Sequence, residues 1–557
     1  MSGGILRSAG KVAVGTLMSR LTGFVRTIVL AAVLGNGAVN NAYNNANVLP
    51  NLVFELLLGG VLTSVIVPLL VRAQREAAER GTDRNAYAQR LFTIAVVGLT
   101  GASIIGMVLA PVLVTVQGLG PSAVNHNLAA LMAVMLLPQM IFYGIGALAG
   151  AVLNIRDSFS APAWAPVANN ILVILVGVGL MVMTSGAKPT MDTFTTGQLL
   201  FLCIGTTLGI VLQALMLIPA WRRVGFTWKW RFDWRGVGLG ELRRLATWVV
   251  GYVLIGQVGF IVASNIANAA DERYGHGSFG LYSQWTYAAL LFQLPYGILG
   301  VSLLTAIMPK MSHAAAAEDW AAVKGYLNDG TRLTGIALIP ISTAFWLLAV
   351  PLTLLFFSAG NFSPEGARYT GLTLAAASIG LLPYATTLLQ LRVFFAAKDS
   401  RTPTLIMVGI VAVRIVLSVA CLALPARYIV IGLAVVNSIA FIVGAILGDV
   451  VLRRRFGNLG TRRTLRQLVR IAVAAVVAVA VATPVYLGLT TGLTGTSAWN
   501  LAGLTGTPLL DASKGVIIVV LGISSAVGLA VYLIEAYALR VPEVQRMFGV
   551  VRRRIPF

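Results

Sequence analysis

Fourteen long apolar runs decide what this chain of 557 residues can fold into. A helix needs about 20 mostly apolar residues to cross the hydrocarbon of a bilayer, and each run is near that length. Because lipid offers no hydrogen-bond partner to an open backbone, such runs cross a membrane as helices. The sequence therefore predicts an all-α polytopic membrane protein with fourteen transmembrane helices. The expected spans are 12–34, 47–71, 91–116, 127–153, 164–184, 197–220, 245–268, 278–309, 331–357, 367–391, 404–424, 428–452, 471–490 and 515–539.

The composition agrees with a membrane protein and excludes other classes. Hydrophobic residues make up 57% of the chain and charged residues only 11%, whereas soluble domains are about a quarter charged. A soluble enzyme, a disordered protein and a fibrous protein are therefore not expected. The two cysteines and three histidines are far apart in the sequence, so no metal-ligand spacing is present and no cofactor is expected.

The positions of Lys and Arg predict the orientation of the chain in the membrane. With the N-terminus in the cytoplasm, most of the 41 basic residues fall in cytoplasmic segments. Cytoplasmic loops normally carry this excess, and one miscounted span would invert every later loop. We therefore expect fourteen spans, both termini in the cytoplasm and a location in the bacterial plasma membrane. The basic residues expected outside are Lys188, Arg273, Arg368, Arg427 and Lys514.

The net charge of +22 has two interpretations. In a soluble protein, such an excess suggests nucleic acid as a partner. Here the basic residues lie between apolar spans, where anionic lipid headgroups attract them, so we expect anionic lipids and no nucleic acid. The segment 222–244 also carries aromatic residues, which suit either headgroup depth or a partner surface. Its neighbourhood contains Trp221, Trp228, Trp230, Phe232 and Trp234.

An internal repeat relates the first twelve spans. Short motifs recur 241 or 242 positions later in the chain. Since six spans separate equivalent helices, the two halves share one orientation, as in transporters built from parallel repeats. The recurring pairs are Gly59 and Gly300, Pro68 and Pro309, Pro162 and Pro403, and the loops 156–158 and 398–400. The predicted domains are a first lobe (1–222), a second lobe (223–452), a basic linker (453–470), two added spans (471–540) and a basic tail (541–557).

Charged residues inside the expected spans are the main candidates for function, because each costs at least about 2.5–3.5 kcal/mol near the bilayer centre. Arg20 and Arg26 share the first span, about 9 Å apart along the helix and about 120° apart around it. They either snorkel to an interface or line a broad cavity, and the polar sequence around them favours the cavity. Guanidinium groups bind phosphate bidentately and stay charged. For Arg414 and Glu535, a helix–helix pair and a functional role are equal alternatives.

The second span begins with an asparagine-rich stretch that extends the polar candidates. Asn41 suits an external loop, whereas the residues further along lie deeper in the membrane. Glu55 would either neutralise one of the arginines or bind a coupling cation. The predicted substrate-binding residues of the cavity are Arg20, Arg26, Asn47, Asn51 and Glu55, with Asn41, Gln293, Arg414 and Glu535 as secondary candidates.

Motifs for catalysis and for nucleotide binding are not found in the sequence. The stretch from Gly4 to Lys11 approaches a P-loop, but its glycine spacing is one residue too long and Val12 replaces the magnesium-binding Ser or Thr. We therefore expect a transporter and not an enzyme. Without an ATP site, its energy would come from an ion gradient, the membrane potential or a downhill substrate.

Several motifs resemble those of the MurJ/MviN lipid II flippases, which belong to the MATE-like exporter superfamily called MOP. The likeness extends over essentially the whole chain, and some actinobacterial relatives of this type continue into a cytoplasmic kinase-like domain. The motifs are Ser19 to Arg26, Leu49 to Leu52, Gly59-Gly60 through Pro68, Leu153-Asn154, Phe159 to Ala163 with Ala165-Pro166, and Leu294 to Gly300.

The resemblance implies two six-helix lobes around a central cavity, and movement of lipid II from the inner to the outer leaflet for cell wall biosynthesis. Lipid II is the undecaprenyl-diphosphate-linked peptidoglycan precursor. Arg20 and Arg26 match family arginines that engage its diphosphate-sugar head, and the last two spans would hold its lipid tail. Cytoplasmic proteins that regulate wall synthesis would be further partners.

The chain also departs from the family pattern at three places. Asn41 stands where many relatives have Asp, Phe54-Glu55 replaces a basic pair, and Leu290 stands where some have Arg. A smaller cationic cavity is therefore expected. The alternatives are a flippase for another polyprenyl-linked polysaccharide and a MATE-like drug/cation antiporter, which would have twelve spans and an acidic cavity.

Overall fold

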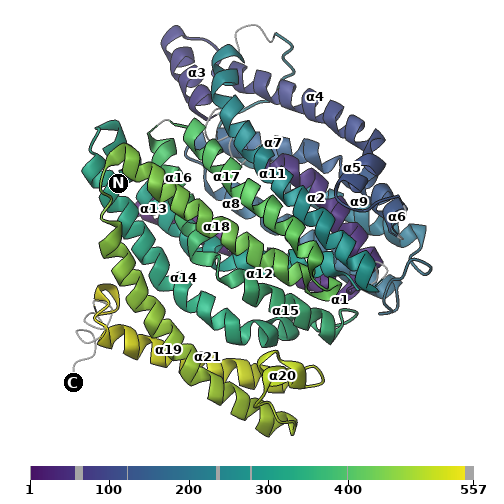
Figure 1. Ribbon diagram of the computed structural model, residues 1–557. Coiled ribbons are helices and arrows are strands. Elements are labelled where there is room, and N and C mark those ends of the chain that lie inside the picture. Colours follow the sequence, from purple (N-terminus) through teal and green to yellow (C-terminus); the bar gives the residue numbers. More distant parts are fainter. Residues whose placement is uncertain are drawn as a thin grey trace. The chain divides into compact units, whose positions relative to one another are not determined.

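The computed structural model describes residues 2–56, 67–121, 123, 125–233, 239–275, 279–397 and 399–545, with the side chains of 2–11, 13, 53–56, 68, 239–246, 301–306 and 309 left out. Figure 1 shows a chain of helices, and the described residues form no β-strand. The all-α prediction is therefore confirmed. Many apolar side chains in the helices point outward, as contact with lipid requires; Val108 is 76% exposed and Val182 is 74% exposed.

Ten described helices are long and apolar enough to cross a membrane, and two further bent helix pairs raise the number to twelve. Twelve of the fourteen expected spans match these segments. Of the other two, 47–71 includes residues 57–66, which the structure does not describe, and 278–309 is divided among three successive helices. A polytopic membrane fold is confirmed, while the count of fourteen stays a prediction.

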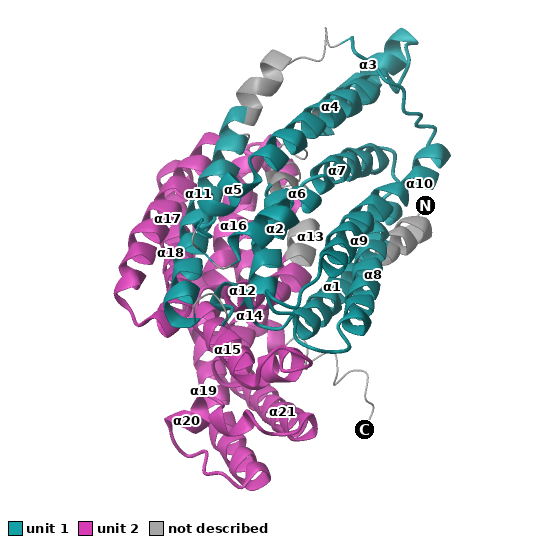
Figure 2. Cartoon of the chain, turned by 90° about the vertical axis from the view of Figure 1, so that its right-hand side faces the viewer, with its two compact units in different colours: residues 1–283 teal, residues 284–557 magenta. Residues whose placement is uncertain are grey.

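The chain divides into two compact units, residues 1–283 and 284–557, coloured separately in Figure 2. The boundary predicted at residue 222 follows the internal repeat, whereas this division follows contacts, so α11 is grouped with the first unit. The first unit contains α1 (Ser2–Leu34), α2 (Ala38–Leu56), α3 (Val67–Arg80), α4 (Ala86–Val108), α5 (Ala110–Val116), α6 (His126–Leu136), α7 (Gln139–Ile155), α8 (Ser160–Met183), α9 (Thr196–Leu215), α10 (Ile218–Arg223) and α11 (Leu239–Gly275).

The second unit begins inside α12 (Leu281–Pro295), which continues into a π-helix (Tyr296–Gly300). Proline at the end of α12 removes a backbone donor, which agrees with the change of helical type at that point. The remaining elements are α13 (Val301–Ala316), α14 (Trp320–Phe357), α15 (Pro364–Ser378), α16 (Leu381–Ala396), α17 (Arg401–Ala420), α18 (Ala426–Phe456), α19 (Thr461–Thr494), α20 (Leu501–Leu504) and α21 (Lys514–Ala538), with 3-10 turns at Cys421–Ala423 and Thr507–Leu509.

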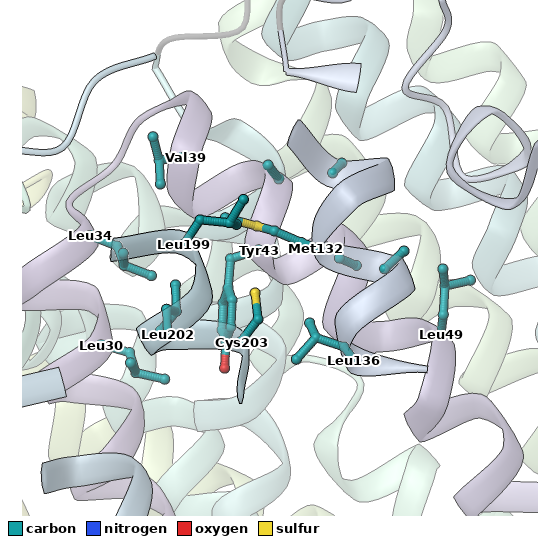
Figure 3. Packing of buried hydrophobic residues seen from close by; sticks show 14 of the residues in the cluster. Leu30, Leu34, Val39, Tyr43, Leu49, Met132, Leu136, Leu199, Leu202 and Cys203 are labelled. Atoms are coloured by element: carbon teal, nitrogen blue, oxygen red, sulfur yellow. The ribbon is translucent and has the colours of Figure 1, made fainter. Parts of the chain in front are cut away.

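A closely packed apolar core holds α1, α2, α6, α8 and α9 together in the first unit. Figure 3 shows part of it, with labelled residues from α1, α2, α6 and α9. Leu34, Ala42 and Leu136 are completely buried in it. Polar groups within this core have partners: the hydroxyl oxygens of Tyr43 and Thr206 lie 3.3 Å apart. This packing fixes the positions of α1 and α2, which carry most of the predicted site residues.

The repeated loops before α8 and α17 support the internal repeat. Pro162 and Pro403 each occupy the third position of the helix that follows, where a proline ring does not interrupt helical hydrogen bonds. The loop contacts differ, because Arg156 donates to Asn85 Oδ1 (2.6 Å) in the first unit and Asp399 pairs with Arg455 in the second. Gly59 and Lys398 lie outside the described residues, so only part of the repeat is visible.

Replacing Asp399 with Asn should weaken the second unit in a pH-dependent way. Burial raises the pKa of Asp399, but hydrogen bonds from Thr402 and the ion pair with Arg455 outweigh it and hold that pKa below its usual range. A carboxylate with a lowered pKa stabilises the fold above its unfolded pKa, about 3.9, and loses this effect as pH falls through its folded pKa. We expect the melting temperature of Asp399→Asn to be about 2 °C lower at pH 7. The difference should disappear in the most acidic buffers, and a difference that does not change with pH would contradict the ion pair.

Candidate functional site

Helix α1 carries both candidate arginines and is fixed to α8 by one buried asparagine. The side-chain amide of Asn170 donates to Ser19 O and to Thr22 Oγ1, each at 3.0 Å. Gly23 faces the same amide, so its missing side chain leaves room for Asn170. Since Ser19 and Thr22 lie between and beside the arginines in sequence, these bonds set the rotation of α1. Sequence reasoning missed Asn170, although an asparagine within an apolar run was a visible signal.

Arg26 lies in a polar cluster formed by three helices. It is half-buried and interacts electrostatically with Tyr143 of α7. The Tyr143 hydroxyl donates to Asn51 Oδ1 at 3.1 Å, and Asn51 Nδ2 donates to Asn47 O at 2.9 Å on α2. The structure thus places Asn51 against Tyr143, with Arg26 within electrostatic range of that tyrosine; that Arg26, Asn47 and Asn51 line a cavity and bind substrate stays a prediction. Tyr143 lies in an apolar run and carries no charge, so the sequence did not reveal it.

Arg20 lies six residues before Arg26 on α1 and is also half-buried. Its Nε atom is buried and makes no hydrogen bond within the described part of the chain. A buried donor of a charged group without a partner is costly. Guanidinium groups form strong, charge-assisted hydrogen bonds with phosphate, so the accessible part of this half-buried group is chemically suited to an anion.

The remaining candidates in α2 have different outcomes. Glu55 falls within the helix, but its side chain and that of Phe54 lie outside the described residues. The expected pairing of Glu55 with an arginine or a cation therefore stays a prediction. Asn41 is 1% exposed and hydrogen-bonds to α11, apart from the Tyr143 cluster.

Three secondary candidates belong to the second unit. Gln293 is exposed on α12, and Glu535 is half-buried on α21. The guanidinium of Arg414 lies 5.5 Å from the centre of the Phe441 ring, a cation–π distance that accounts for part of its burial. Their roles in transport stay predictions.

A second group of buried polar residues, which the sequence did not predict, joins α2 to α11. Asn268 and Asp271 of α11 are 1% and 0% exposed. Asn41 Nδ2 donates to Asp271 Oδ2 at 3.1 Å, and Asn268 Nδ2 donates to Asn45 Oδ1 at 2.9 Å. The expected span ended at residue 268, because the polar residues after it are typical of a loop. The helix continues to Gly275.

The structure describes the aromatic and basic segment after α10 through residue 233. Residues 226–233 run without helical structure beside the first turns of α4. The guanidinium of Arg231 donates to Gln89 Oε1 (2.7 Å) and to Asp83 (2.8 Å). The rings of Trp230 and Phe232 stack at 6.1 Å and remain 57% and 63% exposed. A Trp ring exposed beside the end of a span is typical of the membrane interface.

An apolar cavity of about 360 Å³ lies within the second unit, between α14, α19 and α21. Its lining is almost entirely hydrocarbon, with Thr343, Ser524, Ser525 and Tyr532 as the hydroxyl-bearing residues. Such a lining suits a hydrocarbon chain and not a charged group. The apolar lining residues are Ile336, Ala337, Pro340, Ile341, Ala344, Leu347, Leu348, Ala475, Ala478, Val479, Ala482, Gly528 and Leu529.

Metal binding finds no support in the described part of the chain. Among those residues, no group of three or more His, Cys, Asp or Glu side chains is placed to hold a metal ion.

Many membrane-crossing helices, with cationic and amide side chains buried among them, define a multi-pass membrane transporter. The fold is similar to that of a solved lipid II flippase MurJ in an inward closed conformation, with a TM-score of 0.71, 19% identity, and coverage of 95% of this chain and 98% of that one. It is also similar to a MOP superfamily transporter from Pyrococcus furiosus, with a TM-score of 0.57, 13% identity, and coverage of 81% and 96%.

Residues 30–503 match the family described as lipid II flippase MurJ, and the chain belongs to that family. The probable lipid II flippase MurJ of Haemophilus influenzae is 27% identical over 455 residues, which are 78% of this chain and 83% of that protein. The lipid II flippase MurJ of Burkholderia cenocepacia is 28% identical over 415 residues, which are 72% and 74% of the two chains. The expectation of a transporter, not an enzyme, is confirmed by this membership.

Proposed function

We propose that this chain moves lipid II from the inner to the outer leaflet of the bacterial plasma membrane. The head of lipid II carries a diphosphate, sugars and a peptide, which hydrocarbon does not dissolve. Family membership supports the substrate. The observation that carries the site is the pair of half-buried arginines on α1, one with an unpartnered Nε and one beside Tyr143.

Arg20 and Arg26 would bind the diphosphate, and Asn47 and Asn51 would contact the polar head. Arginine presents five N–H donors in a planar fork and never loses its charge in a protein, which suits a diphosphate. Asn51 already accepts a hydrogen bond from Tyr143, so its amide is held in one orientation. Glu55 would balance part of the positive charge of this site.

The apolar cavity of the second unit would hold part of the polyprenyl tail. Its volume of about 360 Å³ and its hydrocarbon lining suit several isoprene units. Burying a methylene group stabilises binding by about 0.8 kcal/mol, so a short stretch of tail suffices to orient the lipid. In this proposal, the two added spans (471–540) help to bind the lipid tail, whereas the repeated lobes move the polar head.

Transport would proceed by alternating access, with the membrane potential or a coupling cation returning the empty carrier. Both termini would lie in the cytoplasm, as the distribution of basic residues predicts. The exposed Trp230 and Phe232 rings, together with neighbouring basic residues, would contact anionic headgroups at that face. Cytoplasmic proteins that regulate wall synthesis are a second class of proposed partner, and nucleic acid is not one.

Restoring lipid II transport in a depleted bacterium tests this function. Cells that lose their own lipid II flippase should recover outer-leaflet lipid II, near its level before depletion, when they make this chain. The measurement is the fraction of lipid II that an external probe modifies. Cells that make an unrelated polytopic protein are the control.

Two other results would redirect the assignment. Failure to recover lipid II with the protein present in the membrane would favour another polyprenyl-linked polysaccharide as substrate. Export of cationic drugs in the same cells would favour an antiporter.

A further inference from the structure

The apolar cavity between α14, α19 and α21 ends at the ring of Tyr532. Among the residues that line the cavity, Ile336 is the first on α14, Ala475 is the first on α19 and Tyr532 is the last on α21. All three also lie in or against one apolar cluster at that end of the helices. They therefore mark the same end of the cavity.

Beyond Tyr532 the space between the helices is filled. Tyr532 packs in a cluster with Ile471, Ala536, Val541 and Val544, each of which is at most 2% exposed. Protein interiors of this kind are close-packed and leave a displaced ring few other positions. Because Tyr532 belongs both to this cluster and to the cavity lining, the position of its ring decides where the cavity ends.

One hydrogen bond fixes the far end of the Tyr532 ring. Its hydroxyl donates to Ile336 O at 3.0 Å. In a regular helix this carbonyl accepts a hydrogen bond from the backbone N–H four residues later. The residue at that position is Pro340, inside α14, and proline has no backbone N–H. The Tyr532 hydroxyl therefore takes the place of the donor that Pro340 removes.

A second side chain of α21 reaches α14 beyond the opposite end of the cavity. Lys514, the first residue of α21, donates to the backbone carbonyl of Leu354 and, at 3.2 Å, to that of Leu355. These carbonyls belong to the last turn of α14, where no helical donor follows. Both bonds between the two helices thus use carbonyls that α14 leaves open, and the cavity lies between them.

We propose that Tyr532 sets the length of hydrocarbon chain that this cavity accepts, and that Pro340 positions the ring by leaving the Ile336 carbonyl open. A chain longer than the cavity has to displace the ring and break its hydrogen bond. A shorter chain leaves part of the lining without contacts. This deepens the proposed binding of the polyprenyl tail and rests on it.

A series of alkyl thiol reagents measures the length of the cavity without lipid II. Ser524→Cys places a thiol in the lining, about 12 Å from Tyr532 along α21, in a background with Cys203→Ala and Cys421→Ala. Ser524 is completely buried, and its hydroxyl makes no hydrogen bond within the described residues, so the change removes no such contact. The full chain in nanodiscs reacts with alkyl methanethiosulfonates from ethyl to hexadecyl, and mass spectrometry gives each labelling rate.

The labelling rate should rise with chain length, because added methylenes are buried, and fall at the length that reaches Tyr532. Reagents partition equally into the lipid around every variant, so this limiting length is compared among variants. For chains just beyond the limit, Tyr532→Ala should raise the rate about tenfold, as relief of overpacking predicts. Tyr532→Phe keeps the ring and loses only the hydroxyl, and should raise it about fivefold.

A double-mutant cycle tests the role of Pro340. In Pro340→Ala, the new backbone N–H satisfies the Ile336 carbonyl, so the Tyr532 hydroxyl is no longer needed there. Adding Tyr532→Phe to this background should change the rate for the same chains by less than about twofold. A Tyr532→Phe effect that is equally large with and without Pro340 would overturn the positioning role of this proline.

The same changes outside the cavity lining are the matched controls. Tyr537→Ala and Tyr537→Phe alter an exposed tyrosine of α21, and Pro484→Ala alters a proline inside α19; none should move the limiting length. An identical limit in the parent and in Tyr532→Ala would overturn the end wall. If Tyr532→Ala does not accumulate in the membrane, Tyr532→Leu, with a shorter side chain, should still move the limit to longer chains. Because labelling requires no lipid II, failure of the end wall and failure of the proposed substrate give different results.

Discussion

Replacing Arg26 with Ala should reduce lipid II transport about a hundredfold without removing the protein from the membrane. Truncating one partner of a buried charge pair costs roughly 2–5 kcal/mol, and about 1.4 kcal/mol is a factor of ten. Arg26 is half-buried beside Tyr143, and its site includes Asn51 through the Tyr143 hydroxyl. A diphosphate that loses this partner keeps only Arg20 on α1.

Arg26→Lys distinguishes charge from geometry at the same position. Lysine keeps the positive charge but lacks the planar fork of donors. If bidentate binding of the diphosphate matters, Arg26→Lys should recover only part of the transport rate. Arg427→Ala, at an exposed position beside Tyr428 in the second unit, is the matched control and should transport normally. The rate is measured as lipid II reaching the outer leaflet at equal protein abundance, and normal transport by Arg26→Ala would remove Arg26 from the site.

Apolar runs predicted the helices well because burial in lipid leaves a strong signal in the sequence. The same reasoning ended the seventh span at Asn268, since the charged residues that follow, beginning with Asp271, look like loop residues. In the structure Asp271 is buried and hydrogen-bonded to α2, as is Asn268 beside it, so partners distant in sequence, and not local polarity, keep Asp271 in a helix. No local pattern contains that information.

The sequence indicated those candidate site residues that carry a charge within an apolar run. It did not indicate the neutral polar residues around them. Arg20 and Arg26 became candidates because a guanidinium within a span is costly and is usually retained for a function. Tyr143 and Asn170 fit apolar helices without obvious conflict, and only the fold shows that one binds Asn51 and the other fixes α1. Asn41, expected in an external loop, lies buried opposite Asp271. These contacts follow from where each residue lies in the fold, which its residue type alone does not indicate.

Filling the apolar cavity with Gly528→Phe should raise the lipid II concentration needed for half-maximal transport about tenfold, because the ring would occupy space proposed for the polyprenyl tail. A Cβ at Gly528 meets only Ala482 Cβ, at 3.7 Å, which is ordinary contact, so the backbone of α21 accepts a side chain there. The maximal rate should change little, since the arginine site on α1 is untouched.

Tail length provides the decisive comparison for this cavity. Lipid II with a shortened polyprenyl tail makes fewer cavity contacts, so Gly528→Phe should affect its transport less than that of the full-length lipid. Gly522→Phe is the matched control, because it adds the same ring to the same helix at a position with open space around it and outside the cavity lining. Both transport rates are measured in proteoliposomes over a range of lipid concentrations. Equal effects of Gly528→Phe on both lipids would show that the cavity does not hold the tail, whereas a selective loss with the long tail would assign the added helices α19 and α21 to tail binding.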